Sequence, residues 1–270
     1  MTDIKILALD LDGTLFTHDK QVTAENRAAL AYARERGIKV VITTGRPLAA
    51  IGNLLEDLDL VSEDDYSITF NGGLVQRNTG EILSQQGLKD EELDVIFEAL
   101  KAVNLPADFL ADDTVYSVSN GGVKSLYHQA NPMLTFIELD SYLDLPRDIR
   151  YNKVVSVTEA AYLDAAIAEL PSQLRGDFEA FKSREIIFEI MPKGVHKAAG
   201  LDRLCQHLGL DASQVMAMGD EENDLSMLTW AGWGVAMANA TPEVKAVAKA
   251  VTTADNDHSG VAEAVRTYIK

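Results

Sequence analysis

The sequence predicts an α/β fold in which a doubly wound parallel sheet is interrupted by an inserted α+β domain. Three features of the 270-residue chain predict this fold. Short apolar runs alternate with helical patterns in the first third, the alternation is lost in the middle, and it returns in the last third. Because strands that alternate with helices form parallel sheets, we expect a core built from residues 1–83 and 191–270 and an inserted domain over residues 84–190.

The first strand and helix are indicated by their ends as well as by their apolar patterns. Residues 4–9 form a short, nearly continuous apolar run, which is typical of a strand buried on both faces. Thr23 can cap a helix over residues 24–36, and Gly37 suits the left-handed position that ends such a helix. This pair predicts the first strand–helix unit of the sheet.

Two more buried strands are expected at residues 38–43 and 66–70, the second followed by a turn at residues 71–73. Between them, Pro47 suits the first turn of a helix. The apolar face of that helix recurs at helical spacing: Leu48, Ile51, Leu54, Leu55 and Leu58.

The middle of the chain has a different pattern. Apolar residues recur at helical spacing over residues 93–100 and 162–170, and short strand-like runs lie between them. Ile186, Phe188 and Ile190 alternate with other residues, which predicts a half-exposed antiparallel strand.

The last third returns to the first pattern. It predicts a helix over residues 195–207 that ends near Gly209, and strands over residues 215–218, 234–237 and 250–252. The two outer parts of the chain therefore form one Rossmann-like sheet, and we expect the insert to be a cap domain.

Net charge limits the partners of this chain. It carries 42 acidic residues against 24 basic ones, a formal charge of −18 at pH 7. Such a chain repels the backbone of nucleic acids, so we expect no nucleic-acid partner. The same charge repels small phosphate anions, so a phosphate site would need a metal ion and locally placed cations.

Cysteine and apolar patterns indicate the compartment. The single cysteine, Cys205, allows no internal disulfide and lies in a helical run, where we expect it to be buried. The N-terminal segment is too short and too acidic for a signal peptide, and no apolar run approaches the length of a membrane span. We therefore expect a cytoplasmic protein without a membrane partner.

Paired aspartates follow the first predicted strand, in the run Asp10-Leu11-Asp12-Gly13-Thr14. On an extended chain Asp10 and Asp12 point to one side, at the carboxyl edge of the sheet where ligands bind in such folds. Neighbouring carboxylates repel each other unless a cation or a shared proton separates them. One could therefore be an ionised nucleophile while the other transfers protons; the alternative is a pair of aspartates that cap turns.

Thr44, Gly45 and Arg46 follow the second strand. A hydroxyl and a free backbone N–H beside a helix N-terminus suit a phosphate group, and Arg46 could add a bidentate contact. The alternative is a capped helix start with a solvated arginine.

Charged residues also mark the starts of two later helices. Lys197 in a first helical turn opposes the helix dipole, which a nearby carboxylate or phosphate would explain; the alternative is a solvated lysine, as most lone lysines are. Asp220, Glu221 and Asp224 follow another buried strand, and their oxygen atoms suit a hard cation such as Mg²⁺. The alternative is a helix start with acidic residues in its first turn.

The order and spacing of these four clusters strongly resemble the motifs of the haloacid-dehalogenase-like hydrolases. Residues 219–224 and 231–240 are similar to the Cof-type branch of that family, which contains bacterial sugar phosphatases. The resemblance covers essentially the whole chain. It departs at Ala198, where the family usually has glycine, and at His258 and Ser259, where an acidic residue usually precedes glycine.

The resemblance implies a magnesium-dependent phosphatase of small phosphorylated metabolites, above all sugar phosphates. Asp10 would attack phosphorus to form an aspartyl-phosphate, and Asp12 would protonate the leaving alcohol and then activate water. The implied metal ligands are Asp10, the carbonyl of Asp12, Asp220, Glu221 and Asp224. The implied phosphate-binding residues are Leu11, Thr44, Gly45, Arg46, Lys197 and Asn223.

Two other functions use the same residues. A phosphomutase or phosphotransferase would form the same aspartyl-phosphate. A regulator that accepts phosphate without turnover would also carry aspartates at strand ends, although such domains are usually about half this length and lack an insert. The sequence leaves open the preferred phosphate ester and the oligomeric state.

Overall fold

The computed structural model describes residues 3–270 and divides the chain into two compact units. The first unit contains the described residues up to Gly45 together with Asn53–Gln85 and His196–Lys270. The second unit contains Arg46–Gly52 and Gln86–Val195. The expected core differs from the first unit at residues 46–52 and 191–195, which belong to the second unit, and at residues 84–85, which belong to the first.

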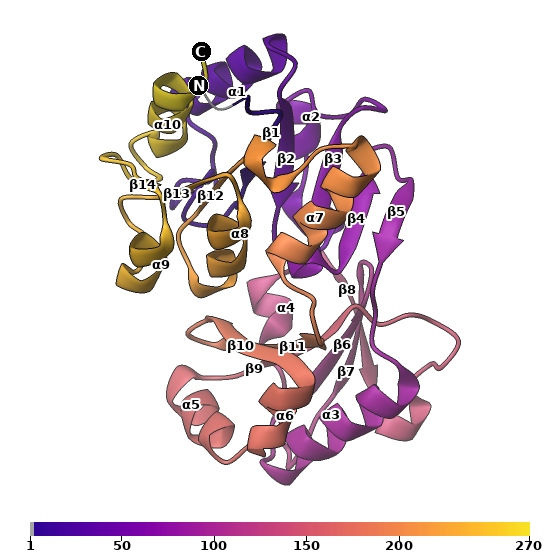
Figure 1. Cartoon of the computed structure of the whole chain (residues 1–270). Coiled ribbons are helices and arrows are strands. Elements are labelled where there is room, and N and C mark those ends of the chain that lie inside the picture. Colours follow the sequence, from indigo (N-terminus) through magenta and orange to yellow (C-terminus); the bar gives the residue numbers. More distant parts are fainter. Residues whose placement is uncertain (1–2) are drawn as a thin grey trace. The chain divides into compact units, whose positions relative to one another are not determined.

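The first unit is built on an eight-stranded sheet (Figure 1). Its strands are β1 (Ile6–Leu9), β2 (Lys39–Thr43), β3 (Tyr66–Thr69), β4 (Leu74–Arg77), β5 (Ile82–Gln85), β12 (Val215–Gly219), β13 (Trp233–Ala236) and β14 (Ala250–Val251). Their order is β14-β13-β12-β1-β2-β3-β4-β5, and all neighbours are parallel up to β3, after which β4 and β5 continue the sheet in antiparallel fashion. Because β1 lies between β2 and β12, the carboxyl ends of these three strands meet at one edge.

The helices of the first unit are α1 (Ala24–Glu35), α2 (Leu54–Asp57), α7 (Lys197–Leu208), α8 (Leu225–Trp230), α9 (Pro242–Val247) and α10 (Gly260–Tyr268). The ends expected for α1 are confirmed: Thr23 Oγ1 accepts the Asn26 N–H at 3.2 Å, and Gly37 follows with a φ of 73°. Gly209 ends α7 in the left-handed conformation.

The central strands are buried because α7 and α8 pack on one face of the sheet. Leu201 of α7 and Met227 of α8 share a core with Ile6, Ala8 and Val215 of the strands. The alternate residues of β1 point to the other face and are also fully buried. The continuous apolar runs of the sequence therefore correspond to strands covered on both sides, as expected.

The single helix expected after Pro47 is wrong. A 3₁₀ turn at Leu48–Ile51 ends at Gly52, whose φ of 62° and ψ of −140° interrupt the helical path, and α2 begins only at Leu54. Apolar residues with one helical period are thus divided between the two units.

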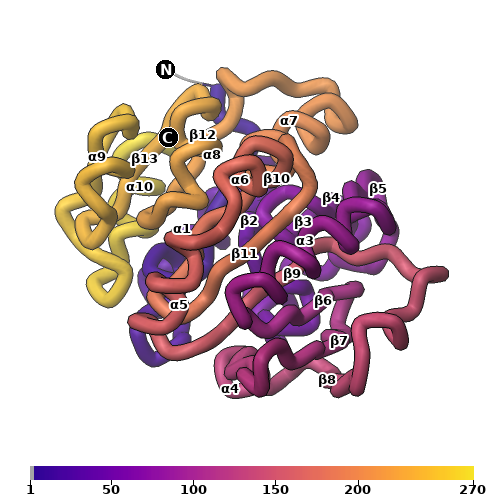
Figure 2. Tube along the Cα trace, turned by 90° about the horizontal axis from the view of Figure 1, so that it is seen from below, coloured from indigo at the N-terminus to yellow at the C-terminus, as the bar shows by residue number. Residues whose placement is uncertain are grey.

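The second unit is built on a six-stranded sheet. Its strands are β6 (Ala107–Ala111), β7 (Thr114–Val118), β8 (Thr135–Leu139), β9 (Lys153–Val157), β10 (Phe178–Arg184) and β11 (Ile187–Pro192), in the order β10-β11-β9-β6-β7-β8. Its helices are α3 (Asp90–Ala102), α4 (Tyr127–Ala130), α5 (Ala160–Ala168) and α6 (Ser172–Asp177). Figure 2 shows α3, α5 and α6 in front of the strands, and their apolar residues form one core with Phe109, Val154 and Phe188.

The strand expected at residues 186–190 is present as β11, but the expectation that it is half exposed is wrong. All six residues of β11 are buried. Its acidic residue, Glu189, forms an ion pair with buried Lys153 of β9, with 2.6 Å between Oε2 and Nζ. The alternation in the sequence therefore reflects a polar pair inside the protein and not a solvated face.

Cys205 is buried in α7, as expected, and burial raises the pKa of its thiol to about 11. Within residues 3–270 no helix combines the length and the apolar character needed to cross a membrane.

Candidate active site at the ends of the central strands

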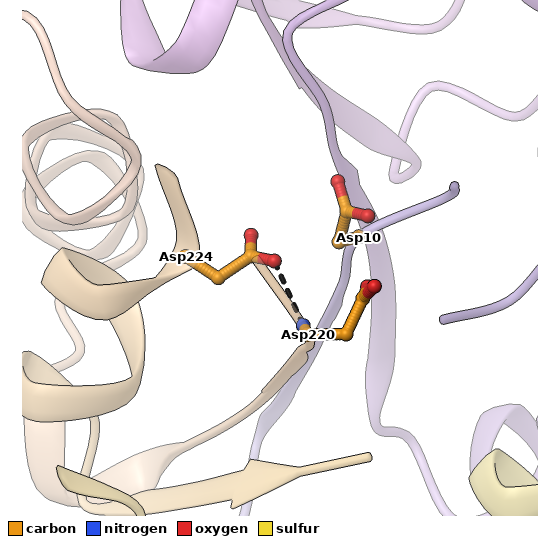
Figure 3. A group of neighbouring side chains, drawn as sticks. All are labelled: Asp10, Asp220 and Asp224. Atoms are coloured by element: carbon orange, nitrogen blue, oxygen red, sulfur yellow. Dashed lines mark hydrogen bonds between the residues drawn. The ribbon is translucent and has the colours of Figure 1, made fainter. Parts of the chain in front are cut away.

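Three aspartates meet where β1 and β12 end. Asp10 directly follows β1 and Asp220 directly follows β12, and because these strands are parallel neighbours their ends lie together. Asp224 belongs to the short 3₁₀ turn that comes next. Figure 3 shows the three side chains gathered there, and one oxygen atom from each lies within 4.8 Å of the others. All three residues are buried.

Lys197 is the cation of this group. It is the first residue of α7 and is fully buried, with Nζ 2.5 Å from Oδ1 of Asp10 and 2.5 Å from Oδ1 of Asp224. His196 is the exposed N-cap of the helix, and its Nδ1 accepts the Ala199 N–H at 3.2 Å. The two carboxylates explain why a lysine stands at a helix start against the helix dipole.

Both oxygens of Asp224 have donors. Oδ1 accepts from Lys197, and Oδ2 accepts the backbone N–H groups of Asp220 and Glu221 at 2.9 and 3.2 Å. Gly219 is required beside it, because a Cβ at that position would lie 2.4 Å from Cγ of Asp224. Asp224 therefore orients Lys197 and holds the backbone that carries Asp220.

Asp220 is held by the loop that follows β1. Thr14 Oγ1 donates to Oδ1 of Asp220 at 2.7 Å. Gly13 has a φ of 80°, and a Cβ there would lie 2.1 Å from Oδ2 of Asp220. Asn239 Nδ2 donates to the Gly13 carbonyl at 2.8 Å, so the loop closes against Asp220 only with glycine at position 13.

Burial dominates the electrostatics of the site. Burial raises the pKa of Asp10 to about 7, an effect that Lys197 opposes and Asp224 reinforces. Burial also raises the pKa of Asp220 to about 8, reinforced by Asp10 and Asp224. Burial lowers the pKa of Lys197, but the charges of Asp10 and Asp224 outweigh it, so this pKa is raised and the ammonium stays charged. When all three carboxylates are ionised, one ammonium leaves an excess of negative charge that a divalent cation would offset.

Asp12 and Glu221 lie outside the group of three. The chain turns after Asp10 instead of remaining extended, and the charge of Asp12 still acts on Asp10, where it adds to the effect of burial on the Asp10 pKa. Asp12 is partly exposed, and its Oδ1 lies 2.6 Å from Nζ of Lys20. Glu221 is exposed as a residue, but partial desolvation of its carboxyl group, followed by the charge of Asp224, raises its pKa.

The residues after β2 are ordered by the turn that follows β3. Thr44 is buried, its N–H donates to the Ile68 carbonyl at 2.8 Å, and its carbonyl accepts the Asn71 N–H at 3.0 Å. The expectation of a free backbone N–H therefore fails at Thr44. Gly45 lies against the side chain of Asn71, where a Cβ would be 2.9 Å from the amide. Asn223 Nδ2 donates to Oδ1 of Asn71 at 3.1 Å.

The other two residues predicted to bind phosphate are Leu11 and Arg46. Leu11 is buried, and its carbonyl accepts the N–H groups of Thr14 and Phe16 at 3.3 and 2.8 Å. Arg46 belongs to the second unit, where its Nη1 donates to the Ala50 carbonyl at 3.2 Å.

The sequence interpretation missed three residues of the site. Thr14 and Asn239 hold the loop around Asp220, and Asn71 contacts both Gly45 and Asn223. Asn71 directly follows the strand predicted at residues 66–70, and that position was the available signal. Asn239 lies outside the four clusters but within residues 231–240, the stretch that resembles the Cof-type branch, and that resemblance was the available signal.

Residues 7–265 match the sequence profile of the haloacid dehalogenase-like hydrolases. YxeH of Bacillus subtilis is 35% identical over 270 residues, which cover 98% of both chains. The 5-amino-6-(5-phospho-D-ribitylamino)uracil phosphatase YcsE of Bacillus subtilis is 31% identical, over 99% of this chain and 96% of its own.

Solved structures agree with this match. A haloacid dehalogenase-like hydrolase from Bacteroides thetaiotaomicron superimposes with a TM-score of 0.83 at 31% identity, over 98% of this chain and 99% of that one. The subclass IIB sugar phosphatase BT4131 superimposes with a TM-score of 0.82 at 26% identity, over 98% of each chain.

Proposed function

Since this chain belongs to the haloacid dehalogenase-like hydrolase family and is a phosphatase of that family, we propose that it hydrolyses small phosphorylated metabolites, above all sugar phosphates, with Mg²⁺. The observation that carries the proposal is the buried group of Asp10, Asp220 and Asp224 around Lys197. Structural capping would not require three buried carboxylates to share one ammonium.

Asp10 is the proposed nucleophile. Lys197 donates to Oδ1 of Asp10 and favours the ionised carboxylate against the effect of burial, which leaves Oδ2 for attack. A bond forms between that oxygen and phosphorus while the bond from phosphorus to the ester oxygen breaks, and Asp12 gives its proton to the departing alkoxide. Asp12 then takes a proton from water, the resulting hydroxide attacks phosphorus, and phosphate leaves as the Asp10 carboxylate is restored.

Asp12 suits a proton-transfer role because its surroundings differ from those of Asp10. Its side chain is partly exposed, so its carboxyl group can exchange protons with solvent, and its ion pair with Lys20 favours the ionised form that takes a proton from water. Two carboxylates in unlike environments can divide the roles of nucleophile and acid.

The donor set fits Mg²⁺. The three clustered side chains offer only oxygen atoms, and both oxygens of Asp224 already accept hydrogen bonds. From the resemblance to the family we propose that Asp10, the Asp12 carbonyl and Asp220 would hold the ion directly, and that Asp224 and Glu221 would support it through water. When bound, Mg²⁺ would supply positive charge beside the phosphoryl oxygens.

Lys197, Thr44, Gly45 and Asn223 are the proposed donors to the phosphoryl oxygens, together with the backbone at Leu11. Hydrogen bonds aimed at oxygens that gain charge in the transition state lower the barrier most when the donors are held in place beforehand. Thr44 and Asn223 are held through Asn71. Arg46 is proposed to contact the rest of the substrate.

The substrate class is proposed from relatives and charge. One relative is named a phosphatase of a phosphorylated ribitylaminouracil, and one structural neighbour is a sugar phosphatase. A net charge of −18 disfavours nucleic acid, and we propose a cytoplasmic enzyme of small phosphorylated metabolites with no membrane partner.

Release of phosphate from a panel of phosphorylated metabolites, with Mg²⁺ and with EDTA, tests the proposal. We expect release that needs Mg²⁺ and is lost in Asp10→Asn. Phosphorus NMR of the products separates hydrolysis from transfer: an isomerised sugar phosphate without free phosphate would identify a mutase instead. A single equivalent of bound phosphate without turnover would identify a regulator.

A further inference from the structure

The turn directly after β3, residues 70–73, has an unusual backbone. Phe70 and Asn71 both adopt left-handed conformations, with φ of 50° and 52°, and both are buried. This region is unfavourable for side chains with a Cβ, and for a residue as bulky as phenylalanine above all. Two such residues in succession indicate a conformation that the surrounding structure holds in place, as is common at functional sites.

The turn contacts the end of β2. The Asn71 N–H donates to the Thr44 carbonyl at 3.0 Å. The side-chain amide of Asn71 occupies the space that a Cβ at position 45 would need, 2.9 Å from both Nδ2 and Oδ1. The amide therefore lies directly against Gly45.

The same amide contacts the segment after β12. Oδ1 of Asn71 accepts a hydrogen bond from Nδ2 of Asn223 at 3.1 Å, across 152 residues of sequence. One planar side chain thus touches two of the proposed phosphate-binding segments, and because it is buried its position varies little.

The turn also contacts the start of α7. Gly72 has a φ of 99°, and a Cβ there would lie 2.3 Å from the carbonyl oxygen of His196. Arg203 Nη1 donates to the Gly72 carbonyl at 3.1 Å. The neighbouring residue of that helix start is Lys197, so the third phosphate-binding segment rests on the same turn.

We propose that Asn71 is a positioning residue that sets the spacing of the phosphate-binding groups of Thr44 and Gly45, Asn223 and Lys197; this inference rests on the proposed function. Pairing of β1 with β2 and β12 aligns the strands, but it does not fix the positions of the residues beyond the strand ends relative to one another. The contacts of Asn71 and of its turn fix these positions. Because the left-handed conformation excludes most residues, an asparagine suits the position both by backbone and by side chain.

The test is Asn71→Gly, which keeps a residue that readily adopts positive φ and removes the amide. The matched control is Asn78→Ala, which removes an asparagine hydrogen bond to the Leu60 carbonyl elsewhere in the same unit. We expect Asn71→Gly to lower kcat/KM by about 100-fold, because misplacement of binding groups by about 1 Å has effects of this size. We expect Asn78→Ala to stay within about twofold of the wild type.

A second readout separates positioning from general loss of stability. Inorganic phosphate is titrated into each folded protein with Mg²⁺ by calorimetry, after thermal unfolding has shown that the variants are folded at the assay temperature. Weaker phosphate binding by Asn71→Gly than by Asn78→Ala supports the inference. Equal affinity in Asn71→Gly and wild type overturns it, whether or not any ester is hydrolysed.

A double variant identifies the route of the effect. If Asn71 acts through Asn223, Asn71→Gly combined with Asn223→Ala loses less kcat/KM than the product of the two single losses. Independent, multiplying losses would contradict the inference. A wild type that releases no phosphate from any ester would defeat the proposed function, whereas an active wild type with an unimpaired Asn71→Gly would defeat the inference alone.

Discussion

Asp10 and Lys197 are 187 residues apart in sequence, and their side chains meet at 2.5 Å. The sequence placed each correctly at a strand end or helix start, because local patterns define those ends. It could not show that Lys197 contacts Asp224 as well, or that Asp12 pairs with Lys20, because these pairs depend on how loops turn after the strands.

Asp10→Asn should lower turnover by on the order of 10⁴-fold or more, since loss of a nucleophile has effects of this size. The fold should persist, because the amide is nearly isosteric and Lys197 keeps Asp224 as a partner. Phosphate release and thermal unfolding measure the two effects. Full activity in Asp10→Asn would refute the assignment of the nucleophile.

Gly13→Ala should lose both stability and activity, whereas Gly37→Ala should lose only stability. Both glycines have positive φ, 80° and 73°, so each substitution should cost about 1–2 kcal/mol of unfolding free energy. Only at Gly13 would the new Cβ collide with Asp220, since within residues 3–270 a Cβ at Gly37 has no atom within 4 Å apart from those of its own chain neighbours.

Denaturant titration measures the stability of both variants, and phosphate release measures their activity. If Gly37→Ala lost as much activity per folded molecule as Gly13→Ala, the collision with Asp220 would not be the cause.

At the level of elements, the helix caps and the buried strands could be predicted from the sequence, and the two wrong predictions have physical causes. The cap of α1 at Thr23 and the left-handed end of α7 at Gly209 follow from local chemistry alone. The prediction of a single helix after Pro47 was wrong because helical spacing of apolar residues cannot reveal that Gly52 adopts a left-handed φ. The prediction that β11 is half exposed was wrong because the sequence shows the alternation but does not show that buried Lys153 pairs with Glu189.

Thr23→Ala should lower the unfolding free energy by about 1 kcal/mol, the usual value for loss of an N-cap hydroxyl. Its hydroxyl also lies 2.8 Å from Ser259 Oγ, next to the start of α10, so loss of that contact acts in the same direction. Thr267→Ala is the control, since that hydroxyl bonds within α10 and caps no helix. Denaturant titration should give a lower free energy of unfolding for Thr23→Ala than for Thr267→Ala. The reverse order would show that the cap contributes little to stability.

At the scale of the whole molecule, charge determines how stability depends on pH. The pKa values of Asp10 and Asp220 are raised by burial from 3.8 to about 7 and about 8, and burial raises that of Asp108 in the second unit to about 7. Between about pH 4 and pH 8 the folded chain therefore holds more protons than the unfolded chain. Stability that is present at the acidic end of this window is lost as the pH rises through these values.

In EDTA we therefore expect the thermal midpoint to fall as the pH rises from about 5 to about 8. Mg²⁺ should restore part of the loss, most at the alkaline end, because the carboxylates it binds are ionised there. Asp220→Asn should show a shallower fall and a smaller response to Mg²⁺. Constant ionic strength is needed, since a net charge of −18 makes the protein sensitive to salt alone. A midpoint at pH 8 that Mg²⁺ leaves unchanged would count against the metal site.

The strand order of the first unit also governs when the site can come into existence during synthesis. β1 pairs with β12, so Asp10 leaves the ribosome about 210 residues before Asp220 does, which at about 5–20 residues per second is roughly 10–40 s. Throughout that interval one side of β1 has no partner strand, and the residues of the second unit, which are nearly continuous in sequence, emerge first in full. A nascent chain of this protein therefore carries an apolar strand edge that needs protection until its last third has been made.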